Sequence, residues 1–433
     1  MSETTSLDSV ATKPLNRLKS ILGGSAGNLV EWYDWYVYSS FTLYFAAVFF
    51  PKGDRTAQLL SAAVVFAVGF LARPFGAWLM GLYADHKGRK AALTLSVGVM
   101  CAGSLVIAVC PGYETIGVGA PIVLVIARLV QGLSLGGEYG ASATYLSEMA
   151  GREKRGFWSS FQYVTLISGQ LLALAVLIVL QRFLTEDQLQ AWGWRIPFAI
   201  GGLLAVTVFW LRSRLDETPS FHAAKGEERA RTMWLFLRHP RETLIVMGLT
   251  AGGTLAFYAY TTYMQKFLAN TSGFSKQSAT EITAAALFVF MLIQPLIGAI
   301  SDKVGRRPVM IAFGVLGVLC TWPIMTTLAR THDATAAFAL VMAALVIVSG
   351  YTAVNAVVKA ELFPTAVRAL GVALPFAIAN AVFGGTAEAV ALKLKDMGHE
   401  EWFYIYVTVM IGVSLLVYWF MRDTQKHSRI LED

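Results

Sequence analysis

Long apolar runs separated by short polar stretches make up most of this 433-residue chain. A helix needs about 20 predominantly apolar residues to cross the hydrocarbon core of a bilayer. Roughly twelve runs approach that length, and clear examples are 57–84, 91–110, 157–180 and 309–328. The pattern therefore predicts an all-α membrane protein with about twelve transmembrane helices.

Two polar motifs between these runs each occur twice. The loop Gly81-Leu-Tyr-Ala-Asp-His-Lys-Gly-Arg-Lys90 recurs in similar form as Gly298-Ala-Ile-Ser-Asp-Lys-Val-Gly-Arg-Arg307. A Glu followed seven residues later by an Arg also recurs, at nearly the same offset, as Glu148 with Arg155 and Glu361 with Arg368. Repeats at one offset indicate a duplicated unit, which here holds six of the expected helices.

The longest polar segment of the chain separates the two repeats and contains Asp216-Glu-Thr-Pro219. Parallel six-helix halves joined in this way are typical of many secondary transporters. We expect a tail at 1–20, an N-terminal half at 21–211, a linker at 212–241, a C-terminal half at 242–421 and a tail at 422–433.

The formal net charge of +7 would also suit a protein that binds nucleic acid or another anionic surface. Most of the 35 Lys and Arg, however, fall before the first run, in alternate loops, in the linker and in the C-terminal tail, and Lys359 is counted among them. This is the positive-inside bias, which predicts cytoplasmic termini and a bilayer, not a nucleic acid, as the partner. The first run lacks a small-residue cleavage site, so we expect it to be retained as a helix.

The duplicated motifs predict a gate at the cytoplasmic ends of the helices. A carboxylate at a helix end can pair with an Arg or cap the next helix, and a glycine permits a tight reversal. The alternative is that these residues only fix topology by their charge. The candidate gating residues are Gly81, Asp85, Gly88, Arg89, Lys90, Asp302, Gly305, Arg306, Arg307, Glu148, Arg155, Glu361 and Arg368.

Glu31, Asp34 and Glu138 fall inside apolar runs, where an ionisable group is costly and usually functional. Glu31 and Asp34 lie three residues apart and so share one helix face. Two carboxylates that close in a low dielectric cannot easily both be ionised, which suits a proton carrier. The alternative is that one or both pair with an Arg. Glu138 is either a further protonation site or a buried partner in helix packing.

Two arginines, Arg73 and Arg128, also fall inside apolar runs. A guanidinium stays charged and presents a fork that fits a carboxylate bidentately, so the two predict a dicarboxylate clamp. The alternatives are a partner for Glu31 or Asp34 in the case of Arg128, and an inner-gate contact for Arg73. Further candidate substrate contacts are Gln131, Tyr163, Gln170, Tyr263, Lys266, Asn355 and Asn380, although an aromatic ring here can simply pack and Lys266 can snorkel to the surface.

Motifs for other chemistries are absent from the sequence. It has no phosphate-binding loop, its six His are scattered, and its three Cys lie in or beside apolar runs without paired spacing. We therefore expect no cofactor, no metal and no enzymatic activity.

The duplicated loops match the signature of the major facilitator superfamily, and Arg128-Leu-Val-Gln-Gly132 resembles its second motif. Further segments resemble the metabolite:proton symporter branch and, within it, the bacterial α-ketoglutarate permeases. One departure is that Lys87, and not a His, directly precedes the loop glycine Gly88. The segments that carry the resemblance include Gly27-Asn-Leu-Val-Glu-Trp-Tyr-Asp34, Trp192-Gly-Trp-Arg-Ile-Pro-Phe198 and Lys359-Ala-Glu-Leu-Phe-Pro-Thr-Ala-Val-Arg368.

This resemblance implies a monomeric symporter of the bacterial inner membrane, which carries a small dicarboxylate with protons by alternating access. α-Ketoglutarate is the first candidate substrate. Citrate, shikimate or a zwitterionic osmolyte are the alternatives within the branch. A membrane receptor would need a signalling domain, and the linker and tails leave little room for one.

Overall fold

The computed structural model describes residues 14–87, 89–136, 139, 143–144, 146–147, 150–213, 238–364 and 367–430. Side chains are described for these residues except 14–28, 81–82, 84–94, 205 and 208–213. Every regular element within this part of the chain is helical.

The first half of the chain contributes six long rods. They are α1 (Pro14–Phe49), α2 (Arg55–Lys87), α3 (Arg89–Val109), α5 (Gly119–Leu135), α8 (Phe161–Phe183) and α10 (Arg195–Ser213). Short helices join them: α4 (Tyr113–Ile116), η1 (Arg152–Lys154), α7 (Arg155–Ser159), α9 (Glu186–Gln188) and η2 (Leu189–Gly193).

The second half contributes six more rods, three of which are interrupted. The unbroken ones are α15 (Lys276–Val304), α16 (Arg306–Ala329) and α21 (Glu401–Phe420). The interrupted ones are α13 (Pro240–Tyr260) with α14 (Met264–Asn270), α17 (Ala334–Thr352) with α18 (Asn355–Leu362), and α19 (Arg368–Ala379) with η4 (Asn380–Gly384) and α20 (Ala387–Asp396).

Many of these helices have the length and the apolar composition of membrane-spanning helices. Within the described residues, eight helices are long and apolar enough to cross a bilayer, and the helical stretches 95–109, 119–135 and 195–204 are shorter but also apolar. Many large apolar side chains point outward, such as Phe75, Leu319 and Phe420. That surface suits lipid, and it confirms the all-α membrane fold predicted from the apolar runs.

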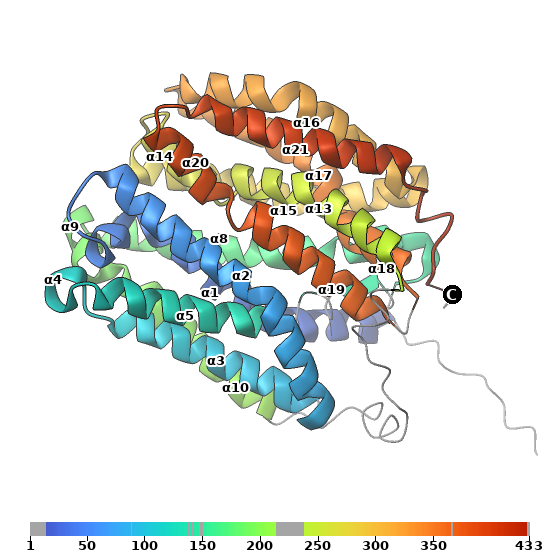
Figure 1. Ribbon diagram of the computed structural model, residues 1–433, viewed down its shortest axis with the longest axis horizontal. Helices are drawn as coiled ribbons and strands as arrows, with labels where there is room; N and C mark the ends of the chain where they lie inside the picture. Colours follow the sequence, from blue (N-terminus) through green and yellow to red (C-terminus); the bar gives the residue numbers. More distant parts are fainter. Residues whose placement is uncertain are drawn as a thin grey trace, which may run out of the picture.

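The two halves lie side by side, with their long helices running in roughly the same direction (Figure 1). Helix α15 packs across the boundary against α7 and α8, and α2 packs against α19 and α20. Within the first half, α5 comes very close to α2, because a Cβ at Gly132 would lie only 2.0 Å from the carbonyl oxygen of Gly69. Small residues at four-residue spacing permit that approach.

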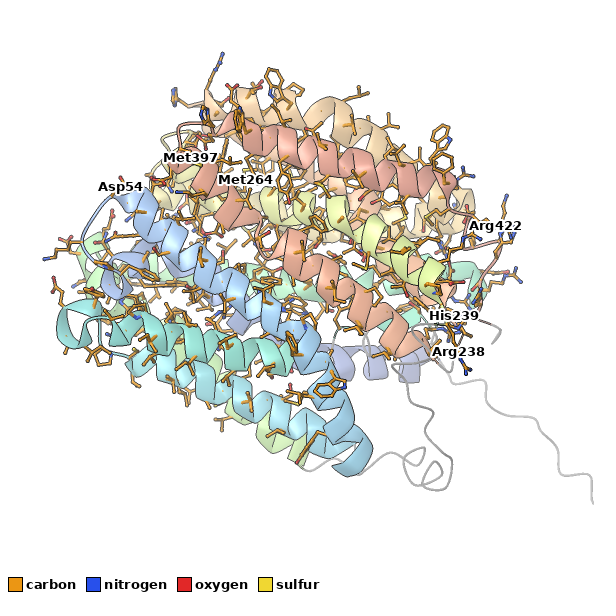
Figure 2. The ribbon with its side chains drawn as sticks, viewed as in Figure 1. Asp54, Arg238, His239, Met264, Met397 and Arg422 are labelled. Atoms are coloured by element: carbon orange, nitrogen blue, oxygen red, sulfur yellow. The ribbon has the colours of Figure 1, made fainter. Side chains whose placement is uncertain are left out.

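The bundle has two distinct ends. We call the end where segment 422–430 lies the tail end; His239 and Arg422 are there (Figures 1 and 2). We call the end that carries α4, α9 and α14 the far end, and Asp54 and Met397 lie there. The first and second halves touch each other at both ends.

The first two helix interruptions in the second half are buried inside the protein, and in the third Asn380, Ala381 and Gly384 are buried while Val382 is exposed. At the first, the N–H of Tyr263 bonds the carbonyl oxygen of Tyr258 at 2.9 Å and so skips the regular helical partner. At the third, η4 is one turn of π-helix. Irregular backbone at membrane depth is tolerated only inside protein or beside a cavity, and π-turns are frequent at functional sites. These interruptions therefore direct attention to the boundary between the halves.

Candidate functional site

A narrow pocket lies at the boundary between the two halves. Trp32, Arg73 and Tyr139 line it from the first half, and Phe376 and Asn380 line it from the second. Because both halves supply walls, any relative movement of the halves changes the shape of this pocket. That arrangement is expected of a site that opens alternately to the two sides.

Arg73 supplies the positive charge of the pocket. It lies in α2 directly before Pro74 and is 5% exposed. Its guanidinium carbon is 4.0 Å from the centre of the Phe70 ring and 4.1 Å from that of Trp35. Its Nε and Nη2 have no hydrogen-bond partner among the described residues. Aromatic faces and a hydrogen bond with Tyr258 offset part of the cost of burying this cation, but the free N–H groups of Nε and Nη2 leave it ready for a carboxylate.

Asp34 lies in a polar network behind the pocket. Its carboxylate accepts hydrogen bonds from Ser104 Oγ and from Gln131 Nε2, the latter at 2.8 Å. Gln131 in turn accepts from Arg128 Nη1 at 2.9 Å. Gln131 therefore links the carboxylate to the guanidinium, which do not contact each other directly.

Arg128 is fully buried and stands apart from the pocket lining. Its guanidinium carbon lies 3.9 Å from the centre of the Trp35 ring, the same ring that Arg73 contacts. Its Nε and Nη2 have no hydrogen-bond partner in the described part of the chain. The predicted pair of arginines is thus divided: Arg73 faces the pocket, Arg128 faces Asp34 through Gln131, and Trp35 connects the two.

The remaining candidate substrate contacts are spread along the boundary. Asn380 lines the pocket and accepts from Thr254 Oγ1 at 2.6 Å. Tyr163 packs edge-on against Phe257 of the other half, with ring centres 5.4 Å apart, and Gln170 is buried in the same helix. Tyr263 packs against Phe403 inside the second half. Glu31 is buried in α1, one turn before Asp34.

Lys266 is buried near the far end and does not snorkel to the surface. Its Nζ lies 2.7 Å from Glu388 Oε2 in an ion pair within the second half, and it donates to Ser39 Oγ of the first half at 2.8 Å. Lys266 therefore contributes to the contact between halves at that end.

Asn355 lies beside a buried lysine. Its Oδ1 accepts from Lys359 Nζ at 2.8 Å and from Tyr139 OH, across the boundary, at 3.2 Å. We expected Lys359 among the loop cations, but this side chain lies fully inside the protein.

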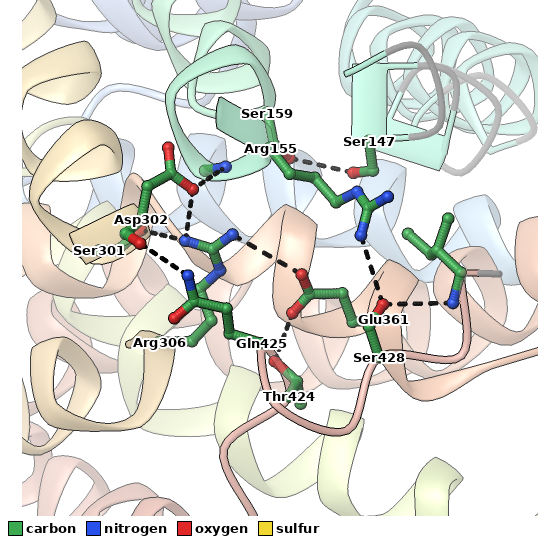
Figure 3. Close-up of polar contacts among 12 residues, drawn as sticks. Ser147, Arg155, Ser159, Ser301, Asp302, Arg306, Glu361, Thr424, Gln425 and Ser428 are labelled. Carbon is green, nitrogen blue, oxygen red and sulfur yellow. Dashed lines mark hydrogen bonds and ion pairs between the residues drawn. The ribbon is translucent and has the colours of Figure 1, made fainter. Parts of the chain in front are cut away.

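At the tail end, Asp302 joins the two halves (Figure 3). Its carboxylate accepts from the backbone N–H of Gly156 at 2.8 Å and of Phe157 at 2.9 Å, at the start of α7, and also from Arg306 Nη1 at 2.7 Å. A carboxylate at a helix N-terminus is favoured by the free N–H groups and the helix dipole. Asp302 thus caps a helix of the opposite half.

The other described gating residues surround this cap. Arg306 Nη2 lies 3.7 Å from Glu361 Oε1, and Thr424 donates to the other oxygen of Glu361 at 2.6 Å. Arg155 Nη1 donates to Ser428 Oγ at 3.5 Å, and Arg368 Nε donates to the carbonyl oxygen of Phe363 at 3.1 Å.

Gly305 and Arg307 complete the loop. Gly305 has a φ of 99°, the left-handed region that favours glycine, and so permits the tight reversal from α15 into α16. Arg307 Nε donates to the carbonyl oxygen of Tyr418 at 3.2 Å. Segment 422–430 packs over this second-half loop.

Several predicted residues lie outside the described part. They are Glu138, Glu148 and Gly88, together with the burial of Gly81 and the side chains of Asp85, Arg89 and Lys90. In the described part, no group of three or more His, Cys, Asp or Glu is placed to hold a metal ion.

Sequence reasoning missed Ser104, Trp35, Tyr139 and Lys359 as members of the site. Ser104 is a small polar residue in an apolar run and carries no distinctive signal. Tyr139 lies next to Glu138 in a glycine-rich stretch that drew attention to its glycines. Lys359 could have been found by noting that it directly follows a long apolar run, where a lysine is costly.

Comparison with known proteins settles the family. The model of the family described as "Sugar (and other) transporter" matches residues 21–240 and 232–430. The chain belongs to the sugar (and other) transporter family. It is therefore a multi-pass membrane transporter and not an enzyme, as the resemblance within the major facilitator superfamily led us to expect.

Relatives within this transporter family differ in what they carry. The chain is 55% identical to the alpha-ketoglutarate permease of Escherichia coli over 96% of both chains. It is 32% identical to a citrate-proton symporter of Salmonella typhi, over 95% of this chain and 96% of that one. A proline/betaine transporter of Escherichia coli is 30% identical, over 94% of this chain and 83% of that one.

A solved structure supports the fold. The proton:xylose symporter XylE superposes with a TM-score of 0.76 and 20% identity, covering 96% of this chain and 98% of that one. The protein has the major facilitator fold, with twelve transmembrane helices in two six-helix halves.

Proposed function

We propose that this transporter is a proton-coupled symporter that imports a small dicarboxylate, with α-ketoglutarate as the first candidate. The observation that carries the proposal is the buried guanidinium of Arg73 at the pocket between the halves, with two nitrogen atoms, Nε and Nη2, that have no hydrogen-bond partner in the described residues. A buried cation whose donor nitrogens have no partner among the described residues favours an anionic substrate over a neutral one. The 55% identity to an alpha-ketoglutarate permease supports the choice of dicarboxylate.

In this proposal Arg73 binds one carboxylate of the substrate. Its planar fork can donate two parallel hydrogen bonds, which fixes orientation as well as position. Asn380, on the other wall, is placed to orient the keto oxygen. Together they connect the two halves through the substrate and so favour a closed arrangement around it.

Asp34 is the proposed proton carrier. When Asp34 takes up a proton it loses one acceptor oxygen, so Ser104 and Gln131 can no longer both donate to a carboxylate. The positive charge of Arg128 is then uncompensated, and the potential near Trp35 and Arg73 becomes more favourable for a dianion. Proton and substrate thereby raise each other's affinity, as linkage requires. Glu31, and Glu138 outside the described residues, are the other candidates for this role.

The proposed setting is the bacterial inner membrane, with a monomer whose two termini lie in the cytoplasm. The positive-inside bias supports this orientation, which makes the tail end the cytoplasmic one. The halves, 21–211 and 242–421, would rock about the pocket, while the linker 212–241 and the duplicated loops restrain them at the cytoplasmic side. Citrate is the second candidate substrate, supported by the 32% identity to a citrate-proton symporter.

The test is uptake of labelled α-ketoglutarate into proteoliposomes with an inward proton gradient. We expect accumulation by the wild type and a loss of about tenfold or more in Arg73→Lys, because the fork is lost. Arg330→Lys, at an exposed position, is the matched control. Competition by citrate, shikimate and betaine identifies the substrate class. No uptake by folded wild-type protein would overturn the proposal.

A further inference from the structure

Lys359 is a buried cation that the proposed transport cycle has not used. It lies in α18, a few residues after the break that follows α17, and its relative exposure is 0%. Among the described residues its Nζ contacts neutral groups: Asn355 Oδ1 at 2.8 Å, Tyr139 OH at 3.3 Å and the face of Phe376, with its ring centre at 3.8 Å. No carboxylate of the described residues lies within ion-pair distance of it.

An ammonium group surrounded in this way is poorly compensated. Removing an ion from water carries a penalty of several kcal/mol, and a neutral amide, a phenol and an aromatic face offset only part of it. Lys266 shows the contrast in the same half, because it is equally buried but has Glu388 as its counter-ion. A membrane protein that buries a lysine among neutral groups is expected to use it for an ion or a substrate.

The position of Lys359 relates it to the pocket. Tyr139 and Phe376 come from opposite halves and stack with ring centres 3.8 Å apart, and both line the pocket. Lys359 contacts both of them, and it lies two residues before Glu361, which belongs to the network at the tail end. The order from the pocket toward the tail end is therefore the Tyr139–Phe376 stack, then Lys359, then the tail-end network.

We propose that Lys359 is a second carboxylate-binding site, used on the path between the pocket and the tail end. This inference rests on the proposed function. When the halves part at the tail end, Tyr139 moves away from Phe376 and from Lys359, because it belongs to the other half. The ammonium then loses a partner just as the path beside it opens. One carboxylate of the departing dicarboxylate replaces that partner, and Arg73 and Lys359 together guide a dianion through the opening.

If Lys359 binds substrate as proposed, its effect depends on the side from which transport is measured and on the number of carboxylates in the substrate. Transport measured from the far side depends on Arg73, because the tail end is still closed when substrate first binds. Transport measured from the tail side also depends on Lys359. A monocarboxylate does not need both cations, so 2-oxobutyrate is the matched probe of a single carboxylate.

The experiment compares Lys359→Met, Lys359→Gln and Lys359→Arg with Lys393→Met in proteoliposomes of known orientation. Lys393 is an exposed lysine in α20 and serves as the control. We expect Lys359→Met and Lys359→Gln to raise the tail-side KM for α-ketoglutarate by about tenfold or more, to change the far-side KM less than about twofold, and to leave inhibition by 2-oxobutyrate unchanged. Lys359→Arg should restore most of the tail-side affinity. A purely structural role would instead alter both sides and both probes alike.

Two results would overturn the proposal, and they are distinguishable from each other. Suppose that the wild type transports α-ketoglutarate or citrate, but that a folded Lys359→Met or Lys359→Gln variant has the same tail-side KM as the control Lys393→Met. Only the proposed role of Lys359 then fails. If the folded wild type moves neither anion, the proposed function fails, and the Lys359 site fails with it. Either neutral variant suffices, so the test stands if one of them does not fold.

Discussion

The two ends of the boundary between the halves are closed by different chemistry. At the tail end, buried and half-buried groups join the halves through Asp302, which accepts from two backbone N–H groups of α7. At the far end, two ion pairs cross the boundary: Arg182 with Glu281 at 3.1 Å, both exposed, and the half-buried Lys276 with the exposed Glu186. Hydrogen bonds from Lys266 to Ser39 and from Gln181 to Thr280, the latter at 3.3 Å, accompany them.

This difference indicates which end is easier to open. An exposed ion pair contributes about 0–1 kcal/mol, whereas a hydrogen bond to a charged group contributes about 1.5–3 kcal/mol. Asp302 accepts two hydrogen bonds of the second kind across the boundary at the tail end, whereas Lys266 donates one at the far end. Backbone also approaches closely at the tail end, where a Cβ added at Gly298 would lie 2.6 Å from the carbonyl oxygen of Gly156. We therefore expect the far end to open at lower cost and the tail end to act as the stiffer gate.

The largest expected effect concerns the buried ion pair at the far end. Lys266→Met leaves Glu388 buried without its counter-ion, which should lower the free energy of unfolding by about 3–5 kcal/mol. The double variant with Glu388→Gln should recover most of this loss, because no uncompensated charge remains. Thermal unfolding in detergent measures both. Equal instability of the single and double variants would contradict the view that the pair stabilises the second half by mutual compensation.

The second prediction weakens the stiffer gate directly. Asp302→Asn removes the charge that caps α7 and pairs with Arg306, at an expected cost of about 3 kcal/mol to tail-end closure. That corresponds to about a hundredfold rise in the population open at this end. The readout is maleimide labelling of Ser160→Cys, a buried position, in a background that lacks the three native cysteines. Asp396→Asn is the control, and unchanged labelling in Asp302→Asn would argue against the gate.

A third variant tests the close approach of backbone at the same end. Gly298→Ala should push α15 away from Gly156, because the added methyl group overpacks this contact. The closed state of the tail end should become less stable by about 2 kcal/mol. Gly412→Ala is the matched control, because a Cβ there meets only ordinary contact at 3.7 Å. The same labelling assay applies, and equal labelling of the two variants would show that the approach does not hold the gate.

The smallest effect is expected at the far-end ion pair between Lys276 and Glu186. The hydrogen bond from Lys276 and its positive charge lower the pKa of Glu186, and burial of Glu186 opposes this with a smaller effect than the hydrogen bond. A lowered pKa stabilises the folded protein at pH values above the ordinary pKa of a glutamate. That contribution is lost as the pH falls through the pKa of Glu186 in the folded state. Because Glu186 is largely exposed, the contribution should stay below about 1 kcal/mol.

Glu186→Gln checks this sign. The melting temperature of the variant should be slightly below that of the wild type at neutral pH, and the difference should vanish as the medium is acidified. A difference that grows on acidification would show that the pair does not act as described.

Some of this architecture was predictable from sequence and some was not. The apolar runs gave the membrane fold, because the bilayer fixes the length and polarity of its helices. Arg128 and Gln131 are three residues apart on one helix, so their contact was within reach. The link from Gln131 to Asp34 joins α5 to α1, and the division of labour between Arg73 and Arg128 depends on which faces of α2 and α5 meet Trp35. The periodicity of apolar residues along one helix does not show which neighbouring helix each face contacts. Lys359 was assigned to a loop because position along the chain does not show depth in the bundle.

The central claim is that a dicarboxylate and protons move together. The most direct measurement adds α-ketoglutarate to wild-type proteoliposomes in a weakly buffered medium, with no imposed proton gradient and with the membrane potential clamped. The account predicts that the external medium becomes more alkaline as labelled substrate enters, and that Asp34→Asn exchanges substrate without this change. Entry of labelled α-ketoglutarate through the wild-type protein with no change in external pH would contradict it.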